Sequence, residues 1–230
     1  MKMLNINKDS TSFCLNYQIT YDALPHSSLK QLPHHVKEQM EELYGLIHHH
    51  PEQTIAPLLN LIEEYPQVPV FYNFLNVAYE ATGQKDKAYA ILNEVYRKHP
   101  DYLFARTNYA FYCLKNQEPE KVPEIFEYKF DLKLLYPQRY VFHITEFTAF
   151  YSVMALYHHA IGNYKLAKIY YKMLREYDPE HKMTKTVRRQ LYPTFLQKVL
   201  VNLTIKFEDK VEKLTKVLKY KHNSDYYKLF

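Results

Sequence analysis

Two stretches of the chain share one layout, and together they decide the fold. Residues 151–179 read YSVMALYHHAIGNYKLAKIYYKMLREYDP, and residues 72–100 read YNFLNVAYEATGQKDKAYAILNEVYRKHP. A tyrosine, a glycine, an alanine and a proline follow one another at the same spacings in both, as Tyr72, Gly83, Ala88 and Pro100 and as Tyr151, Gly162, Ala167 and Pro179. Apolar residues recur at helical spacing on both sides of the glycine, a residue suited to the left-handed end of a helix. Each stretch therefore predicts a pair of helices closed by a proline.

This layout resembles the tetratricopeptide repeat, a family of helix pairs with a period of about 34 residues. Asn76 and Ala155 stand where the family often has glycine, and Val95 and Leu174 stand where it prefers alanine. The residues that carry the resemblance are Tyr72, Leu75, Gly83, Ala88, Leu92 and Pro100 in one pair, and Tyr151, Met154, Gly162, Ala167, Tyr171 and Pro179 in the other.

The period extends from these pairs in both directions. Pro66 lies one such period before Pro100, and we predict a degenerate first pair over residues 34–66, with His48-His49-His50 in place of the turn glycine. A third pair is expected over residues 103–136.

The third pair breaks the period. Its second helix is predicted to begin at Pro119 and Pro123. The interval from Gly83 to Gly162, however, exceeds two periods by enough chain for about three helical turns. We therefore expect an extended helix on either side of Pro137.

The predicted fold is an all-α, tetratricopeptide-like solenoid, wound as a right-handed superhelix. Its helix pairs cover residues 34–66, 69–102, 103–136 with an insertion to 147, and 148–181. Asp86, Asp101 and Asn163 are predicted to cap helices within them. Three glycines in 230 residues also favour helices over tight β-turns.

The two ends of the chain differ from this array. Residues 1–33 predict an N-terminal arm, extended or partly ordered, with a strand-like sequence from Phe13 to Tyr21. Residues 182–230 hold 12 basic and 4 acidic side chains. They predict a short helix and then a long, basic, amphipathic helix that caps the array.

No sequence motif of an enzyme is present. A nucleophile elbow, a phosphate loop and a zinc HExxH motif are all missing, so we expect no catalytic activity and no cofactor. The adjacent histidines, such as His158-His159, point about 100° apart on a helix and do not form an i,i+4 metal pair. We expect no metal site, and we expect His158 to pack as an aromatic side chain.

The cysteines and the hydropathy indicate the compartment. Cys14 and Cys113 are the only cysteines, so no disulfide framework is expected. The N-terminus lacks the apolar run of a signal peptide, and no stretch is apolar for the length of a membrane span. The sequence predicts a cytoplasmic protein without a transmembrane segment.

The resemblance implies a function in protein binding, because the first helices of such pairs line a concave groove that binds peptides or partner helices. Asn73 and Asn108 resemble part of a carboxylate clamp, but Val77, Phe104 and Ala149 stand where its basic residues would be. We therefore expect a non-catalytic scaffold or adaptor whose groove binds an apolar or amphipathic peptide or helix. The groove candidates are Val70, Asn73, Val77, Glu80, Phe104, Thr107, Asn108, Phe111, Leu114, Ala149, Ser152, Leu156 and His159.

Three alternatives remain open at this point. The groove is filled by the chain's own N-terminal arm or C-terminal helix, or the basic segment 182–221 binds nucleic acid or another acidic surface. Nucleic acid is the weaker choice, since the lysines are dispersed and no base-reading motif accompanies them. The apolar stripe of the C-terminal helix also suits a homodimer.

Overall fold

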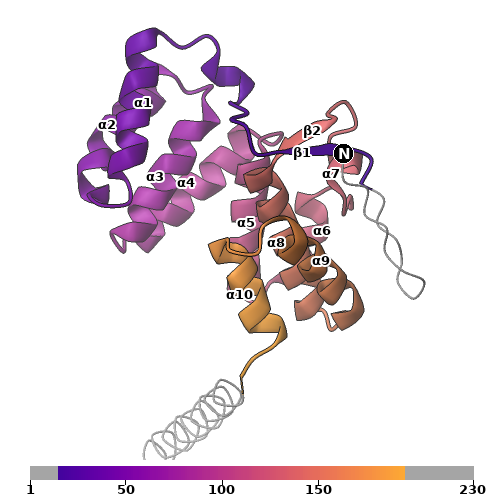
Figure 1. The fold of residues 1–230 in the computed structure, drawn as a ribbon. Coiled ribbons are helices and arrows are strands. Elements are labelled where there is room, and N and C mark those ends of the chain that lie inside the picture. The colour runs from indigo at the N-terminus through magenta and orange to yellow at the C-terminus, as the bar shows by residue number, and fades with distance from the viewer. Residues whose placement is uncertain (1–14, 195–230) are drawn as a thin grey trace, which may run out of the picture. The chain divides into compact units, whose positions relative to one another are not determined.

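The computed structural model describes residues 15–194, and most of this part is helical (Figure 1). The chain divides into two compact units after Val187, and the fold below is that of the first unit. The prediction of an all-α, tetratricopeptide-like fold is confirmed. The longer helices are α1 (His34–Leu46), α2 (Pro51–Glu64), α3 (Pro69–Ala81), α4 (Lys85–Lys98), α5 (Leu103–Lys115), α8 (Ile144–Ala160), α9 (Tyr164–Tyr177) and α10 (Lys182–Leu191).

Helix α3 shows how the repeat residues produce the structure. Pro69 lies in its first turn, where a missing amide hydrogen costs nothing. At its end, the amide of Gln84 donates to the carbonyl of Tyr79 over 2.9 Å, which leaves Gly83 at a φ of +73°. This left-handed position favours glycine and turns the chain back into α4.

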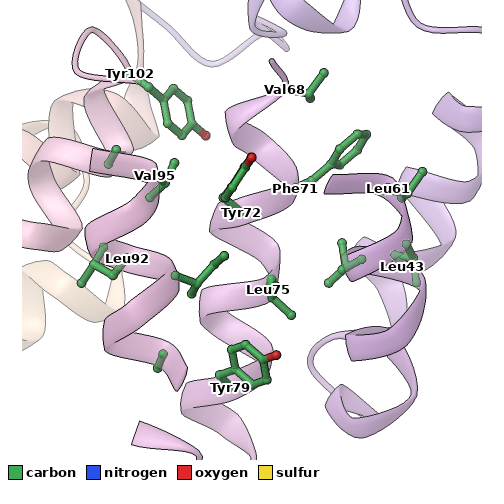
Figure 2. Close-up of a cluster of buried hydrophobic side chains, with 14 of the residues drawn as sticks. Leu43, Leu61, Val68, Phe71, Tyr72, Leu75, Tyr79, Leu92, Val95 and Tyr102 are labelled. Carbon is green, nitrogen blue, oxygen red and sulfur yellow. The ribbon is translucent and has the colours of Figure 1, made fainter. Parts of the chain in front are cut away.

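The buried side chains of α3 hold it between its neighbours. Phe71 points towards Leu61 of α2, while Tyr72 lies on the side facing α4 (Figure 2). Phe71, Tyr72 and Leu75 are all fully buried. Burial of each such side chain contributes about 1.5–3 kcal/mol, so α3 stabilises the first two pairs together.

Asn76 shows how one departure from the repeat pattern is accommodated. Its side chain is buried, and its amide nitrogen donates a hydrogen bond of 2.8 Å to the carbonyl of Ala88. The polar group is therefore paired across the contact between α3 and α4.

The prediction of a second helix in the third pair is correct only for its first turn. After a short 3-10 turn (Pro119–Lys121), α6 covers only Val122–Ile125. The buried guanidinium of Arg106 donates to the carbonyl of Ile125 over 3.0 Å and pairs with Glu127 at 2.6 Å. Glu127 and Tyr128 then take left-handed conformations, which no helix can continue through.

The predicted extended helix around Pro137 is also wrong. The segment instead holds α7 (Leu132–Leu135) and the strand β2 (Val141–His143). Asp131 caps α7 by accepting the amide of Lys133 over 2.8 Å. Pro137 disfavours helical geometry at the residue before it, so α7 ends after one turn.

The strand-like N-terminal sequence forms β1 (Gln18–Thr20), which pairs in parallel with β2. Gln18 lies opposite Val141 and Thr20 opposite His143. Residues 1–14 lie outside the described part. After β1, the arm continues through a 3-10 turn (Ser27–Leu29) to α1.

A buried chain of hydroxyl groups attaches β1 to the helices. The hydroxyls of Tyr17 and Tyr151 are 2.7 Å apart, and Tyr151 donates to the Asp131 carboxylate over 2.9 Å. Burial is the main cause that raises the pKa of Tyr151 well above its usual value, so this hydroxyl stays protonated and keeps donating. The N-terminal arm, α7 and α8 are thereby joined.

The predicted caps were correct in one case of three. Asn163 accepts the amide of Leu166 over 3.3 Å at the start of α9. Asp86 lies inside the first turn of α4, and Asp101 lies before the capping residue of α5, which is Tyr102. Both acids still lie near the positive end of a helix dipole.

Two further predictions concern the C-terminal part and membranes. The long basic helix predicted after residue 194 lies outside the described residues. Among the helices between residues 15 and 194, none combines the length and the apolar character of a membrane span.

Candidate functional site

The first helices of the second and third pairs, α3 and α5, contact each other. The amide of Asn108 on α5 donates to the side-chain oxygen of Asn73 on α3 over 2.7 Å. These residues are 35 positions apart, so they hold nearly equivalent places in consecutive pairs. The contact brings together two of the predicted groove residues.

The side chains around this amide pair are mostly apolar and half-buried. Val77 lies one turn after Asn73, while Phe104 and Phe111 lie one turn on either side of Asn108. Phe104 contacts the ring of Tyr102 at a centroid distance of 5.7 Å, which holds it in place. We call this set the first-helix surface, and its residues are Val70, Asn73, Val77, Phe104, Asn108 and Phe111.

The amide pair leaves hydrogen-bonding capacity free. Each asparagine side chain has one carbonyl oxygen and one amide nitrogen, and their mutual bond uses one of each. The remaining Asn73 nitrogen and Asn108 oxygen have no other partner within residues 15–194. These free groups are the two N–H bonds of Asn73 and the carbonyl oxygen of Asn108. They lie beside apolar side chains and can pair with the carbonyl and the N–H of a peptide group.

The predicted groove continues only partly onto α8. Leu156 and His159 are half-buried, as are Leu114 and Ala149, and Glu80 is exposed. Thr107 and Ser152 are fully buried, so we leave them out of the candidate surface. Thr107 belongs to α5 and Ser152 to α8, and these two helices pack directly against each other.

The arginine of α5 does not lie on this surface. Arg106 is buried on another side of the helix, where it donates to the carbonyls of Pro100 and Ile125. It also binds Glu127, and the hydrogen bonds from Lys129 and from Arg106 lower the pKa of that carboxyl to about 2. Arg106 is therefore a structural residue that fixes the α6 turn.

Three side chains of the described N-terminal arm make polar or ring contacts away from the first-helix surface. Tyr17 meets Tyr151 of α8, and the hydroxyl of Tyr21 donates to the carbonyl of Tyr177. The His26 ring packs edge-on against Tyr102 at 5.2 Å. Leu29 and Leu32 of the arm, by contrast, lie in the apolar cluster that also includes Val70 and Phe104.

His158 packs as an aromatic side chain, as predicted. It is 6% exposed and stacks on Tyr170, with ring centroids 5.5 Å apart. Its Nδ1 has no hydrogen-bond partner within the described residues, and burial lowers its pKa. In residues 15–194, no three His, Cys, Asp or Glu side chains gather closely enough to hold a metal ion.

The sequence profile of the tetratricopeptide repeat matches residues 77–102. Residues 77–102 therefore carry a tetratricopeptide repeat. The matched segment covers the end of α3, all of α4 and the turn to α5, which together are the larger part of the second helix pair. No curated protein and no solved structure matches the chain.

Tetratricopeptide repeats are modules of protein–protein interaction. Sequence patterns identified both asparagines but not their pairing, which needs the α3–α5 contact. The Tyr17–Tyr151–Asp131 chain was also missed, because its members are spread over more than a hundred residues.

Proposed function

We propose that this protein binds an apolar or amphipathic peptide or helix on its first-helix surface. The observation that carries the proposal is the hydrogen bond between Asn73 and Asn108, flanked by Val77, Phe104 and Phe111. It aligns two consecutive first helices at the positions that the family uses for partners. The role is non-catalytic and that of a scaffold or adaptor.

The chemistry of the surface favours a particular kind of ligand. The half-buried aliphatic and aromatic side chains gain free energy when a ligand removes them from water, about 25 cal/mol for each Å² of apolar surface. The free donor and acceptor of the asparagine pair match one peptide group of an extended segment or one polar side chain of a helix. Cationic side chains are missing from the set, so a free carboxylate is a poor ligand.

A peptide selection tests this directly. Peptides selected from a displayed random library against the full chain are expected to be apolar or amphipathic. Phe111→Glu should weaken them at least tenfold, because a carboxylate replaces an apolar contact, and the paired Asn73→Ala/Asn108→Ala variant should weaken them less. Calorimetry gives the affinities.

The matched control is Tyr128→Glu, which adds the same charge at an aromatic residue that is 68% exposed after α6. Circular dichroism and thermal unfolding show whether each variant is folded. The proposal fails if folded Phe111→Glu and Tyr128→Glu bind the selected peptides equally.

The second candidate function is binding of nucleic acid or another acidic surface through residues 182–221. In favour, Lys182, Lys185 and Arg188 are exposed on α10, while Thr184 and Val187 are buried. Residues 195–221, and the predicted homodimer contact, lie outside the described part. Retention of duplex RNA or DNA that falls steeply with salt would support this function, and salt-independent or absent retention would oppose it.

The cytoplasmic location of the protein is a prediction from the sequence alone.

A further inference from the structure

Helix α9 has a second surface with a different character. Ala167, Tyr171 and Leu174 are buried on one side. On the opposite side, Lys165, Lys168, Lys172 and Arg175 are exposed. Their spacing of three, four and three residues aligns them along the helix, over about 15 Å at 1.5 Å per residue. We call these four residues the α9 stripe.

The charges of the α9 stripe are not neutralised within the described chain. None of its four side chains takes part in an ion pair between residues 15 and 194. Glu176 is the single acidic residue of α9. Like charges three and four residues apart on a helix repel one another, so the stripe lowers the stability of α9 slightly when no partner is present.

Helix α4, the equivalent helix two pairs earlier, shows what this side contacts inside the array. When Gly83 is aligned with Gly162, the stripe corresponds to Asp86, Tyr89, Asn93 and Tyr96. Tyr89 stacks on Tyr112 of α5 at 4.4 Å, and Tyr96 stacks on Tyr109 of α5 at 4.5 Å. This side of α4, the second helix of its pair, therefore accommodates a neighbouring helix, α5. In α9, cations stand where α4 has these tyrosines.

The kinds of residue exposed on α9 favour one class of anionic partner over the others. From Lys165 to Glu176, every exposed side chain is charged. Tyr164 precedes the first cation, and its ring packs edge-on against His159 at 5.4 Å. Nucleic-acid surfaces usually add aromatic side chains on which bases stack, and membrane-binding helices add apolar side chains that enter the bilayer. Neither kind stands between the cations here, so a protein partner with complementary charge fits best.

We propose that the α9 stripe docks an acidic helix of a partner protein, lying along α9 as α5 lies along α4. Acidic residues at positions i, i+4, i+7 and i+11 of a partner helix repeat every 4.5–6 Å, at about 1.5 Å per residue, like the cations of the stripe. The contact is electrostatic, so it speeds association and weakens as salt rises. This surface is separate from the first-helix surface.

The test uses the full chain and a defined probe. The probe is a fluorescent helical peptide of alanine and glutamine with glutamate at i, i+4, i+7 and i+11, and anisotropy measures its binding at low and physiological salt. Lys168→Glu/Lys172→Glu/Arg175→Glu should weaken binding at least tenfold. Replacing the peptide's glutamates with lysine should restore binding to this variant.

The matched control is Lys85→Glu/Arg97→Glu/Lys115→Glu, which changes the net charge equally at exposed residues of α4 and α5. It should bind the acidic peptide within a few-fold of the wild type. Equal loss in both variants would overturn the proposal, since only net charge would then matter. Tighter binding of the wild type to phosphatidylserine vesicles or to duplex RNA than to the peptide would overturn it too. Phe111→Glu tests the first-helix surface separately and should leave this peptide's binding unchanged.

Discussion

Gln117 takes at the end of α5 the left-handed backbone conformation that Gly83 takes at the end of α3. It lies one repeat period after Gly83 and has a φ of +61°. The same two backbone bonds surround it: Glu118 donates to the carbonyl of Cys113 over 2.9 Å, and Gln117 donates to Leu114 over 3.2 Å. The third pair thus keeps the turn of the repeat while using a residue that this conformation disfavours.

Replacing Gln117 with glycine should therefore stabilise the protein. Glycine removes the strain of a side chain in the left-handed region, which costs about 1–2 kcal/mol, but it also gives the unfolded chain more freedom. The net gain in the free energy of unfolding is expected to be about 0.5–1 kcal/mol, measured by urea unfolding. Gly83→Ala makes the opposite change and should cost about 1 kcal/mol. A loss of stability in Gln117→Gly would contradict this account.

His158 gives the core a dependence on pH. Because burial lowers its pKa in the folded state, the unfolded chain binds a proton more readily than the folded one. Its contribution to stability is present above the ordinary histidine pKa of about 6.5 and is lost as the pH falls below it. In His158→Phe the ring stack with Tyr170 persists without a titrating group. The difference in unfolding free energy between neutral and mildly acidic buffer should be smaller in this variant, and an equal difference would contradict the prediction.

At the scale of elements, two strands and two single-turn helices replace a full second helix in the third pair. Helix α3 packs against α2, whereas α8 packs against α5 and the strands β1 and β2. The hydroxyl of Tyr72 donates to the carbonyl of Pro66, whereas the equivalent Tyr151 donates to Asp131 and meets Tyr17. The N-terminal arm is thus part of the fourth pair's packing.

The hydroxyl chain predicts a ranking of two conservative variants. Tyr17→Phe removes the outer hydroxyl and one hydrogen bond, at a cost of about 1 kcal/mol. Tyr151→Phe removes the central hydroxyl and leaves both the buried Tyr17 hydroxyl and one Asp131 oxygen without this partner, at a cost of about 2–3 kcal/mol. Thermal or urea unfolding gives the ranking. A larger effect of Tyr17→Phe would show that the bond between the hydroxyls is not the important one.

The sequence allowed prediction of those elements whose information is local. Gly83, Gly162 and their neighbours repeat at fixed spacings, and α3, α4, α8 and α9 formed as expected. The α6 turn was not predictable, because it depends on the Arg106 guanidinium binding the carbonyl of Ile125. β2 was missed for a similar reason, since its partner β1 lies more than a hundred residues away. For the first-helix surface, the sequence identified the residues. The Asn73–Asn108 hydrogen bond and the exposure of the α9 stripe depend on how the helices pack, so the sequence alone did not predict them.

At the scale of the whole first unit, stability is expected to be uneven along the array. Helix α8 contributes eleven buried residues and α1 only two, Val36 and Leu43. Arrays of repeats open from their less stable ends, because each pair contacts only its neighbours. In hydrogen exchange, the amides of α8 should be protected longest, and those of α1 should exchange well before them. Equal protection of α1 and α8 would mean that the unit opens only as a whole.

The parallel pairing of β1 with β2 also sets an order of events while the protein is made. Tyr17 and Tyr151 are 134 residues apart, so at about 5–20 residues per second β1 waits on the order of ten seconds for its partners to be synthesised. The first two helix pairs can form during that time, since their contacts are between near neighbours. The fourth pair is completed only when a segment made early returns to one made late.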